Sequence, residues 1–307
     1  MISPREIVIE RIAAVVGEET RDNSESVSPE VIAATGFAFK RTTSKTLFEL
    51  ALPAAKAALG DGMADVSAVI AATFSNEVRC PSLAVRIATA LGLPASVPAF
   101  DLQMACSAYP YALFTAGQWA AASGGKVLVV DGDVQSRFAA DASVLPVTSD
   151  ACTATLVSVR EGESRFAFYS GYGEELKCSE RMEMDGFGVF SFVATEVRSM
   201  IKELLAEDGS VPDLFVPHQA NMYMVRQLAK GLGLSGHLLT SGEKYGNVGS
   251  ASIPLTLASA YSAGDVPGGC RVLLAGFGAG LSAAAGFVRI AGNFTAAIFE
   301  DPGKERQ

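Results

Sequence analysis

The chain has 307 residues, of which 49% are apolar and 19% are charged, and its formal net charge is −9. This length and apolar content suffice for a large core, either in one big domain or in two fused halves. The acidic balance, with no cluster of lysine or arginine, argues against nucleic acid or an anionic membrane as a partner.

The first residues and the longest apolar runs predict a cytoplasmic protein. The opening MISPREIVIE carries charges where a signal peptide would be apolar. No uncharged apolar run reaches the roughly 18 residues of a membrane-spanning helix. The five cysteines are odd in number, widely spaced and without a CxxC pair, which predicts neither a disulfide framework nor a metal site.

Apolar, β-rich runs alternate with Ala- and Leu-rich runs of helical periodicity along the chain. Strands are predicted at residues 7–16, 66–72, 126–132, 153–159, 213–218, 271–278 and 284–290. Helices are predicted at residues 46–60, 82–92, 111–125, 196–208, 222–233 and 253–264. This alternation predicts an α/β fold with mostly parallel strands in a sheet covered on both faces. Residues 17–30 are expected to form a surface loop, and residues 293–307 a frayed tail.

A weak internal repeat suggests that the chain consists of two similar halves. Residues 107–132 and 250–278 each begin with serine, continue as a helix, and reach a buried strand after a Gly-Gly pair and a basic residue. We therefore predict an N-terminal half at residues 1–163 and a C-terminal half at residues 164–307.

Cys106 lies in DLQMACSAYP, where an extended segment gives way to a helix. A thiol at a helix N-terminus faces unpaired N–H groups and the positive end of the helix dipole, and both favour the nucleophilic thiolate. The same N–H groups can hold an oxyanion. By itself, however, a cysteine between alanine and serine is more typical of a small buried side chain.

His218 and Asn247 are two further candidates for a catalytic or substrate-binding side chain. His218 ends an apolar strand in VPHQAN, where α/β sheets place their sites, and neutral imidazole can donate a hydrogen bond or accept a proton. Asn221 follows where it can cap the next helix. Asn247 lies in KYGNVGSASIP, and its amide donates and accepts without titrating. Taken singly, a structural histidine and a turn asparagine explain both patterns, and His237 is predicted in a surface loop.

The segment GFGAGLSAAAG at residues 276–286 predicts a glycine-rich turn after a buried strand. The chain has neither GxGxxG nor GxxxxGK[ST], so the phosphate-binding loops that these motifs define are not expected. A turn of this kind can instead bring a backbone N–H close to a reacting carbonyl.

The order of these segments resembles the β-ketoacyl-[acyl-carrier-protein] synthase III family of the thiolase-fold condensing enzymes. Cysteine is followed by HQAN, by GNxxSASIP and by a glycine-rich turn before a final strand. MDGFGVFSFVATEV at 184–197 and SNEVRCPSLAVRIATALG at 75–92 are similar to further family segments. The resemblance extends from about residue 35 to 290. It implies a thiolase fold, in which two similar βα halves stack as αβαβα layers.

The resemblance also implies a reaction and its residues. Cys106 would accept an acyl group from a coenzyme A or carrier-protein thioester. His218 and Asn247 would bind a malonyl thioester and stabilise the enolate that decarboxylation releases, for a Claisen condensation. The N–H groups of Cys106 and Ala279 would form the oxyanion hole. Further substrate contacts are expected at Met104, Cys80, Phe190, Asn221 and Gly278.

The family resemblance implies a homodimer, acyl carrier protein or coenzyme A thioesters as partners, and no permanently bound cofactor. The family often has a phenylalanine at the position of Cys80 that reaches the partner's acyl pocket, and a smaller side chain there leaves room for a longer acyl group.

Four positions depart from the family pattern. The Asp-Glu-Trp-Ile segment, whose tryptophan stacks on coenzyme A, is not recognisable. Tyr223 and Ser191 stand where basic residues are usual, and Ala279 stands where the family has glycine. Because the first three departures weaken the grip on an anionic donor, we expect a specialised fatty-acid, polyketide or secondary-metabolite pathway instead of initiation from acetyl-CoA.

Several alternatives remain open at this stage. A cysteine-protease triad requires a base that touches the thiol. Degradative thiolases carry a second cysteine in the C-terminal glycine-rich turn, which this chain lacks. A same-fold acyltransferase would pass the acyl group to a hydroxyl, amine or thiol without decarboxylation. A non-catalytic, acyl-binding partner subunit would need none of the three catalytic side chains.

Overall fold

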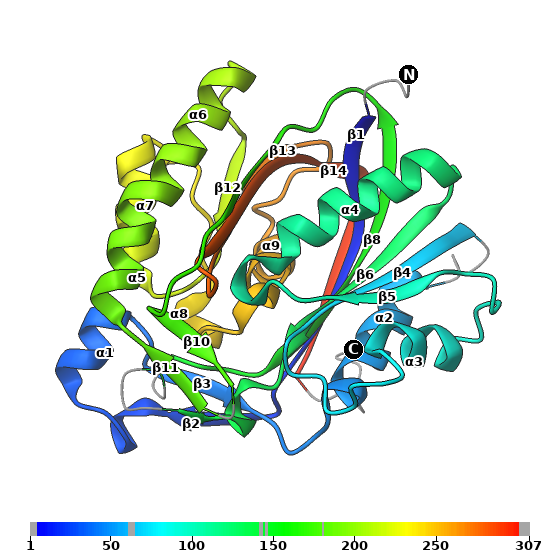
Figure 1. The fold of residues 1–307 in the computed structure, drawn as a ribbon. Coiled ribbons are helices and arrows are strands. Elements are labelled where there is room, and N and C mark those ends of the chain that lie inside the picture. The colour runs from blue at the N-terminus through cyan, green and yellow to red at the C-terminus, as the bar shows by residue number, and fades with distance from the viewer. Residues whose placement is uncertain (1–4, 61–64, 141–143, 145–146, 180, 301–307) are drawn as a thin grey trace.

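The computed structural model describes the chain except residues 1–4, 61–64, 141–143, 145–146, 180 and 301–307. Within the described residues, no helix is both long and apolar enough to cross a membrane. Figure 1 shows helices on both flanks of a large sheet and further helices between its two parts.

The N-terminal part of the sheet has five strands in the order β5-β4-β6-β8-β1. Their bounds are β1 (Arg5–Val16), β4 (Val66–Ala72), β5 (Ala99–Leu102), β6 (Lys126–Asp133) and β8 (Ala151–Glu161). The pairs β4–β5 and β4–β6 are parallel, and the pairs β6–β8 and β1–β8 are antiparallel.

The C-terminal part repeats this pattern in the order β12-β13-β14-β9. Its strands are β9 (Phe166–Ser170), β12 (Leu214–Pro217), β13 (Arg271–Gly278) and β14 (Ser282–Phe299). The pair β12–β13 is parallel, and the pairs β13–β14 and β14–β9 are antiparallel, as for β4, β6, β8 and β1. The second half of β14 also pairs with β1, so hydrogen bonds join both parts into one nine-stranded sheet.

Three hydrophobic clusters define the layers. One joins α4 (Ala108–Ser123) and α9 (Ser252–Ala263) to inward-facing strand residues of both halves. A second packs α2 (Leu47–Leu59) and α3 (Leu83–Ala90) on the outer face of the N-terminal strands. A third packs α5 (Gly186–Phe192), a π-helix (Val193–Val197), α6 (Arg198–Asp208) and α7 (Met222–Leu232) on the C-terminal strands. This αβαβα stacking confirms the predicted thiolase architecture.

Smaller elements surround the end of the sheet where Cys106 lies. They are β2 (Glu19–Asp22), η1 (Asn23–Glu25), α1 (Pro29–Thr35), β3 (Phe39–Thr42), η3 (Ala105–Ser107), η4 (Gln135–Arg137), β7 (Ala139–Ala140), β10 (Leu176–Cys178), β11 (Arg181–Met184), α8 (Gly242–Tyr245) and η6 (Gly249–Ala251). Strands β10, β11 and β7 form a separate three-stranded sheet, and β2 pairs with β3.

The structure corrects three expectations. The main sheet is mixed, because β8, β9 and β14 are antiparallel additions to parallel pairs. Residues 17–30 contain β2 and the start of α1 and are not only a loop. Residues 293–299 belong to β14, where they pair with β1, and 301–307 lie outside the described residues. The predicted division at 163/164 falls between β8 and β9 and stays a prediction.

Candidate active site

Cys106 lies in a strained turn between β5 and α4. Ala105 has a φ of 43°, which is unfavourable for a residue with a Cβ. Ala105 is the first residue of η3, which leads directly into α4. The hydroxyl of Ser107 donates to the Met104 carbonyl at 2.8 Å and braces the turn. The strain and the brace present Cys106 at the start of a helix, where backbone N–H groups lack helical acceptors.

The glycine-rich turn after β13 packs against Cys106. A Cβ added at Gly278 would lie 2.8 Å from the Cys106 Cβ and 3.3 Å from its Sγ, so only glycine fits. The hydroxyls of Ser107 and Ser282 lie 2.7 Å apart, and Ser282 Oγ also lies 2.7 Å from the Ala279 carbonyl oxygen. This chain of hydroxyls fixes the two turns against each other. Among the described residues, no backbone carbonyl accepts a hydrogen bond from the Ala279 N–H.

His218 follows β12 and is 2% exposed. Its N–H donates to the Ala275 carbonyl at 2.7 Å, which continues the pairing with β13. Its Nδ1 lies 2.9 Å from the Ser252 hydroxyl at the start of α9. Burial lowers the pKa of His218 to about 4, and a backbone hydrogen bond to Gly249 opposes this shift. The imidazole is therefore neutral at pH 7.

Asn247 is held by backbone on both sides. Its N–H donates to the Val147 carbonyl at 2.8 Å, and its carbonyl accepts from the Ser149 N–H at 2.8 Å. Its Oδ1 accepts from the Gly249 N–H at 2.9 Å. Its Nδ2 makes only a 3.5 Å contact with the Ala220 carbonyl, two residues after His218. The amide N–H₂ is therefore the group with donor capacity to spare.

Cys106, Asn247 and Ala279 line one cavity of about 190 Å³. Half of its other lining residues are large apolar side chains, which suits an acyl group. They are Phe74, Phe138, Val144, Val147, Leu176, Met182 and Met184. His218 is not in this wall but adjoins it, because Gly249 bonds to both His218 and Asn247.

The electrostatics of Cys106 differ from the expectation that a helix start favours thiolate. Burial raises the pKa of Cys106 to about 12, and the carboxyl groups of Asp133 and Asp131 add to this effect. Both carboxyls lie on β6 and are buried. Burial also raises the pKa of Asp133 to about 6 and that of Asp131 well above its usual range. The thiol is therefore protonated at pH 7.

The remaining predicted substrate contacts lie in different places. Gly278 touches Cys106, as described. Met104 packs against the central core, and Phe190 stacks on Tyr223 with ring centroids 5.9 Å apart; neither lines the cavity. The Asn221 side chain accepts from the Met224 N–H at 2.8 Å, which confirms the predicted helix cap. Cys80 is exposed and does not line the cavity of its own chain.

Sequence reasoning missed most residues of the cavity wall, including those from two separate parts of the chain. The first is the β10–β11 hairpin, which brings Cys178 and Met182 into the wall of the cavity that Cys106 also lines. Its strands are too short to give a periodic signal, and only MDGFGVF, which starts at Met184, pointed to this region. The second is Gln135, which no motif singles out.

Solved structures with this fold define the class of protein. The β-ketoacyl-[acyl carrier protein] synthase III of Thermus thermophilus superposes with a TM-score of 0.85 at 30% identity, covering 94% of this chain and 99% of that one. The priming β-ketosynthase of the R1128 polyketide biosynthetic pathway superposes with a TM-score of 0.86 at 25% identity, covering 95% and 98%. The fold and the acyl-sized cavity beside a thiol thus define a thiolase-fold condensing enzyme.

Sequence comparison narrows the class to a family. The family models for 3-oxoacyl-[acyl-carrier-protein] synthase III and for its C-terminal part match residues 100–171 and 210–290. The β-ketoacyl-[acyl-carrier-protein] synthase III of Vesicomyosocius okutanii is 32% identical over 274 residues, which are 82% of this chain and 87% of that protein. The chain belongs to the 3-oxoacyl-[acyl-carrier-protein] synthase III family. It is an acyltransferase that forms a carbon–carbon bond by Claisen condensation and takes acyl-CoA or acyl-carrier-protein thioesters as substrates.

Proposed function

We propose that Cys106 carries the acyl group and that His218 and Asn247 act on the malonyl thioester. The observation that carries this proposal is the close approach of Gly278 to Cys106, where an added Cβ would lie 3.3 Å from the thiol sulfur, beside a cavity that Cys106, Asn247 and Ala279 line. The N–H groups of Cys106 and Ala279 are the proposed oxyanion hole. Both belong to turns that hydroxyl contacts hold together, which gives the preorganisation such a site needs.

In the first half-reaction the Cys106 sulfur attacks the thioester carbonyl. The tetrahedral oxyanion accepts from the two N–H groups, the C–S bond to the donor breaks, and acyl-Cys106 forms. The leaving thiolate takes up a proton, equivalent to the one that Cys106 gives up. Because the pKa of Cys106 is raised, this proton leaves only as the substrate binds, and the free enzyme holds an unreactive thiol.

In the second half-reaction the malonyl thioester loses CO₂ to give an enolate. Nε2–H of His218 and Nδ2–H of Asn247 donate to its oxygen, and two neutral donors in a dry site stabilise that charge by several kcal/mol. The enolate carbon attacks acyl-Cys106, a carbon–carbon bond forms, and the C–S bond to Cys106 breaks. The released sulfur takes up one proton, which balances the reaction.

The test is to incubate the enzyme with a panel of acyl-CoA and acyl-carrier thioesters and weigh the protein. Cys106→Ala should abolish the acyl mass shift, and labelled acyl groups that still attach would remove Cys106 from its role. His218→Ala and Asn247→Ala should keep acylation and lose CO₂ release from malonyl-CoA. CO₂ release in the intact enzyme distinguishes condensation from plain acyl transfer.

We further propose a homodimer in the cytoplasm, working in a specialised pathway. Strand β5 ends the nine-stranded sheet, so its outer edge is available to a strand of a second copy. The apolar cavity supports an acyl group larger than acetyl. The relationship to a polyketide priming β-ketosynthase supports a role outside housekeeping fatty-acid synthesis.

A further inference from the structure

Gln135 is a buried polar residue beside the cavity, and no step of the reaction described above uses it. It begins η4, two residues after the last residue of β6, and is 5% exposed. Its Nε2 lies 2.9 Å from the Ser149 carbonyl and 2.9 Å from the Asn247 carbonyl, and donates to both. The side chain thereby spans from the end of β6 to the loop that carries Asn247. It lines both the Cys106 cavity and the neighbouring polar groove that contains Arg21 and Lys40.

The bond from Gln135 completes the fixation of Asn247. The Asn247 carbonyl has two acceptor positions, and the Ser149 N–H and Gln135 Nε2 fill both. Within the described part of the chain, Gln135 is the only side chain that hydrogen-bonds to Asn247, since the other partners are backbone groups of Val147, Ser149, Gly249 and Ala220. Loss of this bond would leave one lone pair of a shielded carbonyl without a donor.

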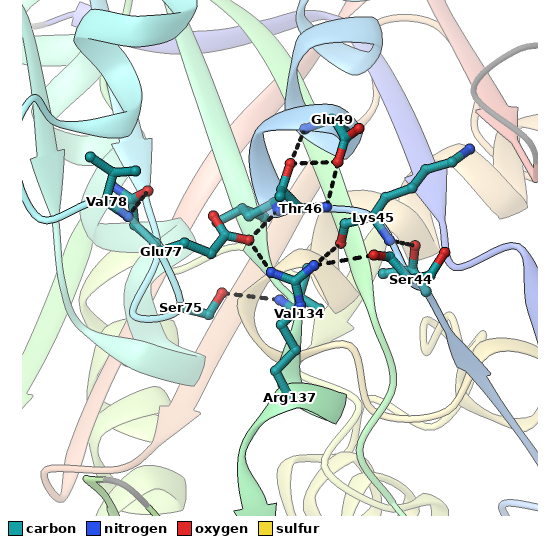
Figure 2. A network of polar contacts seen from close by, with 12 residues as sticks. Ser44, Lys45, Thr46, Glu49, Ser75, Glu77, Val78, Val134 and Arg137 are labelled. Atoms are coloured by element: carbon teal, nitrogen blue, oxygen red, sulfur yellow. Dashed lines mark hydrogen bonds and ion pairs between the residues drawn. The ribbon is translucent and has the colours of Figure 1, made fainter.

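The short helix η4 that carries Gln135 is itself held from several directions. The Ser136 N–H and hydroxyl donate to the Asp150 carboxylate at 2.9 and 2.5 Å. Figure 2 shows the guanidinium of Arg137 joined to Glu77 and to the Lys45 carbonyl, both at 2.5 Å. Because the backbone of η4 is held in this way, the Gln135 side chain loses little further conformational freedom when it forms its hydrogen bonds.

The same network ties Gln135 to the ends of the N-terminal strands. Glu77, which pairs with Arg137, also accepts from the Leu47 N–H at 2.7 Å at the start of α2. The Val134 N–H donates to the Ser75 hydroxyl at 3.0 Å, in the loop after β4. Through its hydrogen bond to the Asn247 carbonyl, Gln135 thus links this network at the ends of the N-terminal strands to Asn247.

We propose that Gln135 is a positioning residue that sets the direction of the Asn247 amide for the malonyl step and has no part in acylation of Cys106. This inference rests on the proposed function of Asn247. The two half-reactions separate the effects, because Asn247 is needed for enolate stabilisation and not for thioester exchange. A displacement of about 1 Å at such a donor costs on the order of 10²-fold in rate.

The experiment compares Gln135→Leu with the native enzyme and with Gln118→Leu, the same change at an exposed position of α4. Two rates are measured for each protein: acylation of Cys106 by acetyl-CoA and octanoyl-CoA, by mass, and CO₂ release from carboxyl-labelled malonyl-CoA. We expect Gln135→Leu to lower CO₂ release at least about 10-fold and to leave acylation within about threefold. Gln118→Leu should change neither rate.

A second variant keeps the test decisive if Gln135→Leu folds poorly. In Gln135→Glu, a protonated carboxyl can donate one hydrogen bond, whereas a carboxylate donates none and faces two carbonyl oxygens. CO₂ release relative to the native enzyme should therefore be higher at about pH 5.5 than at about pH 8, with no such difference for acylation. A purely structural role would move both rates together.

The outcomes separate this inference from the proposed function. Unchanged CO₂ release in Gln135→Leu and Gln135→Glu, or an equal fall in both half-reactions, overturns the role of Gln135 while Asn247→Ala still loses CO₂ release. If Asn247→Ala itself retains CO₂ release, the proposed function fails and the positioning role fails with it.

Discussion

Gly278→Ala tests whether the contact between the glycine-rich turn and Cys106 governs acyl transfer. The new methyl carbon would lie 2.8 Å from the Cys106 Cβ and 3.3 Å from its sulfur. Carbon atoms in contact normally lie about 3.5–4.0 Å apart, so one of the two turns must move by about 1 Å. Neither turn can move alone, because the hydroxyls of Ser107 and Ser282 join them at 2.7 Å.

The expected effects follow from this displacement. Overpacking of a tight site costs about 1–3 kcal/mol of folding free energy, which a folded protein of this size tolerates. The Ala279 N–H shifts relative to the thioester carbonyl, and a misplacement of about 1 Å costs about 10²-fold in rate. Acylation of Cys106 by octanoyl-CoA, followed by mass, should therefore slow by about that factor, while the protein remains folded in circular dichroism and thermal unfolding.

The control is Gly236→Ala. Among the described residues, apart from the two chain neighbours of Gly236, no atom lies within 4 Å of a methyl group added there. This variant should acylate at the native rate. Native acylation by Gly278→Ala would refute the reasoning, because the oxyanion hole would then not depend on the tight approach of Gly278 to Cys106.

Three further predictions concern single side chains. Alkylation of Cys106 by iodoacetamide should keep rising to about pH 10, because only the thiolate reacts and its pKa is raised to about 12; a plateau below about pH 9 would contradict this. Asn221→Ala should lower the free energy of unfolding by about 1 kcal/mol, since its Oδ1 caps the Met224 N–H; denaturant titration that gives an unchanged stability would reject the cap. Cys80→Phe should shorten the preferred acyl chain in acyl-CoA profiling, and an unchanged profile would end the idea that Cys80 borders a partner's acyl pocket.

Much of the fold could be predicted because its strands are buried on both faces. Residues 66–72, 126–132 and 271–278 are mostly apolar, and β4, β6 and β13 match them within a residue. The repeat of serine, helix, Gly-Gly and strand in the sequence also has a counterpart in the structure. It corresponds to η3-α4-β6 and η6-α9-β13, which occupy equivalent places in the two halves.

The errors arose where pairing is decided by distant residues. Strand β14 continues through Asn293 to Phe299 although this stretch is polar in part, because β1 lies alongside and supplies hydrogen bonds. The polar segment Glu19–Asp22 is a strand only because it pairs with Phe39–Thr42. The antiparallel direction of β8 likewise depends on its neighbours β6 and β1, which the local sequence does not reveal.

The sequence motifs predicted the residues of the proposed site, and their roles stay a prediction, whereas the electrostatics of Cys106 differ from the expectation. The turn motifs around Cys106, His218 and Asn247 have a fixed order that sequence displays directly. The pKa of Cys106 depends instead on burial and on the carboxyl groups of Asp133 and Asp131. These two residues come 25 or more positions later in the sequence. No local pattern near Cys106 indicates that two buried carboxyl groups of β6 raise its pKa.

The pKa shifts of Cys106 and His218 distinguish a cysteine-protease pair from a condensing site. A thiolate–imidazolium pair needs the cysteine pKa lowered and the histidine pKa raised. Here burial raises the pKa of Cys106 and lowers that of His218, so both side chains are neutral at pH 7. A neutral His218 cannot hold a stable positive charge to activate the thiol, but it can donate Nε2–H to a developing enolate without carrying a charge of its own. In the proposed mechanism the low dielectric of the site strengthens that hydrogen bond, and Asn247 is the proposed second neutral donor. The electrostatics therefore favour decarboxylative condensation over proteolytic chemistry, because the raised pKa of Cys106 and the lowered pKa of His218 keep both side chains uncharged at pH 7.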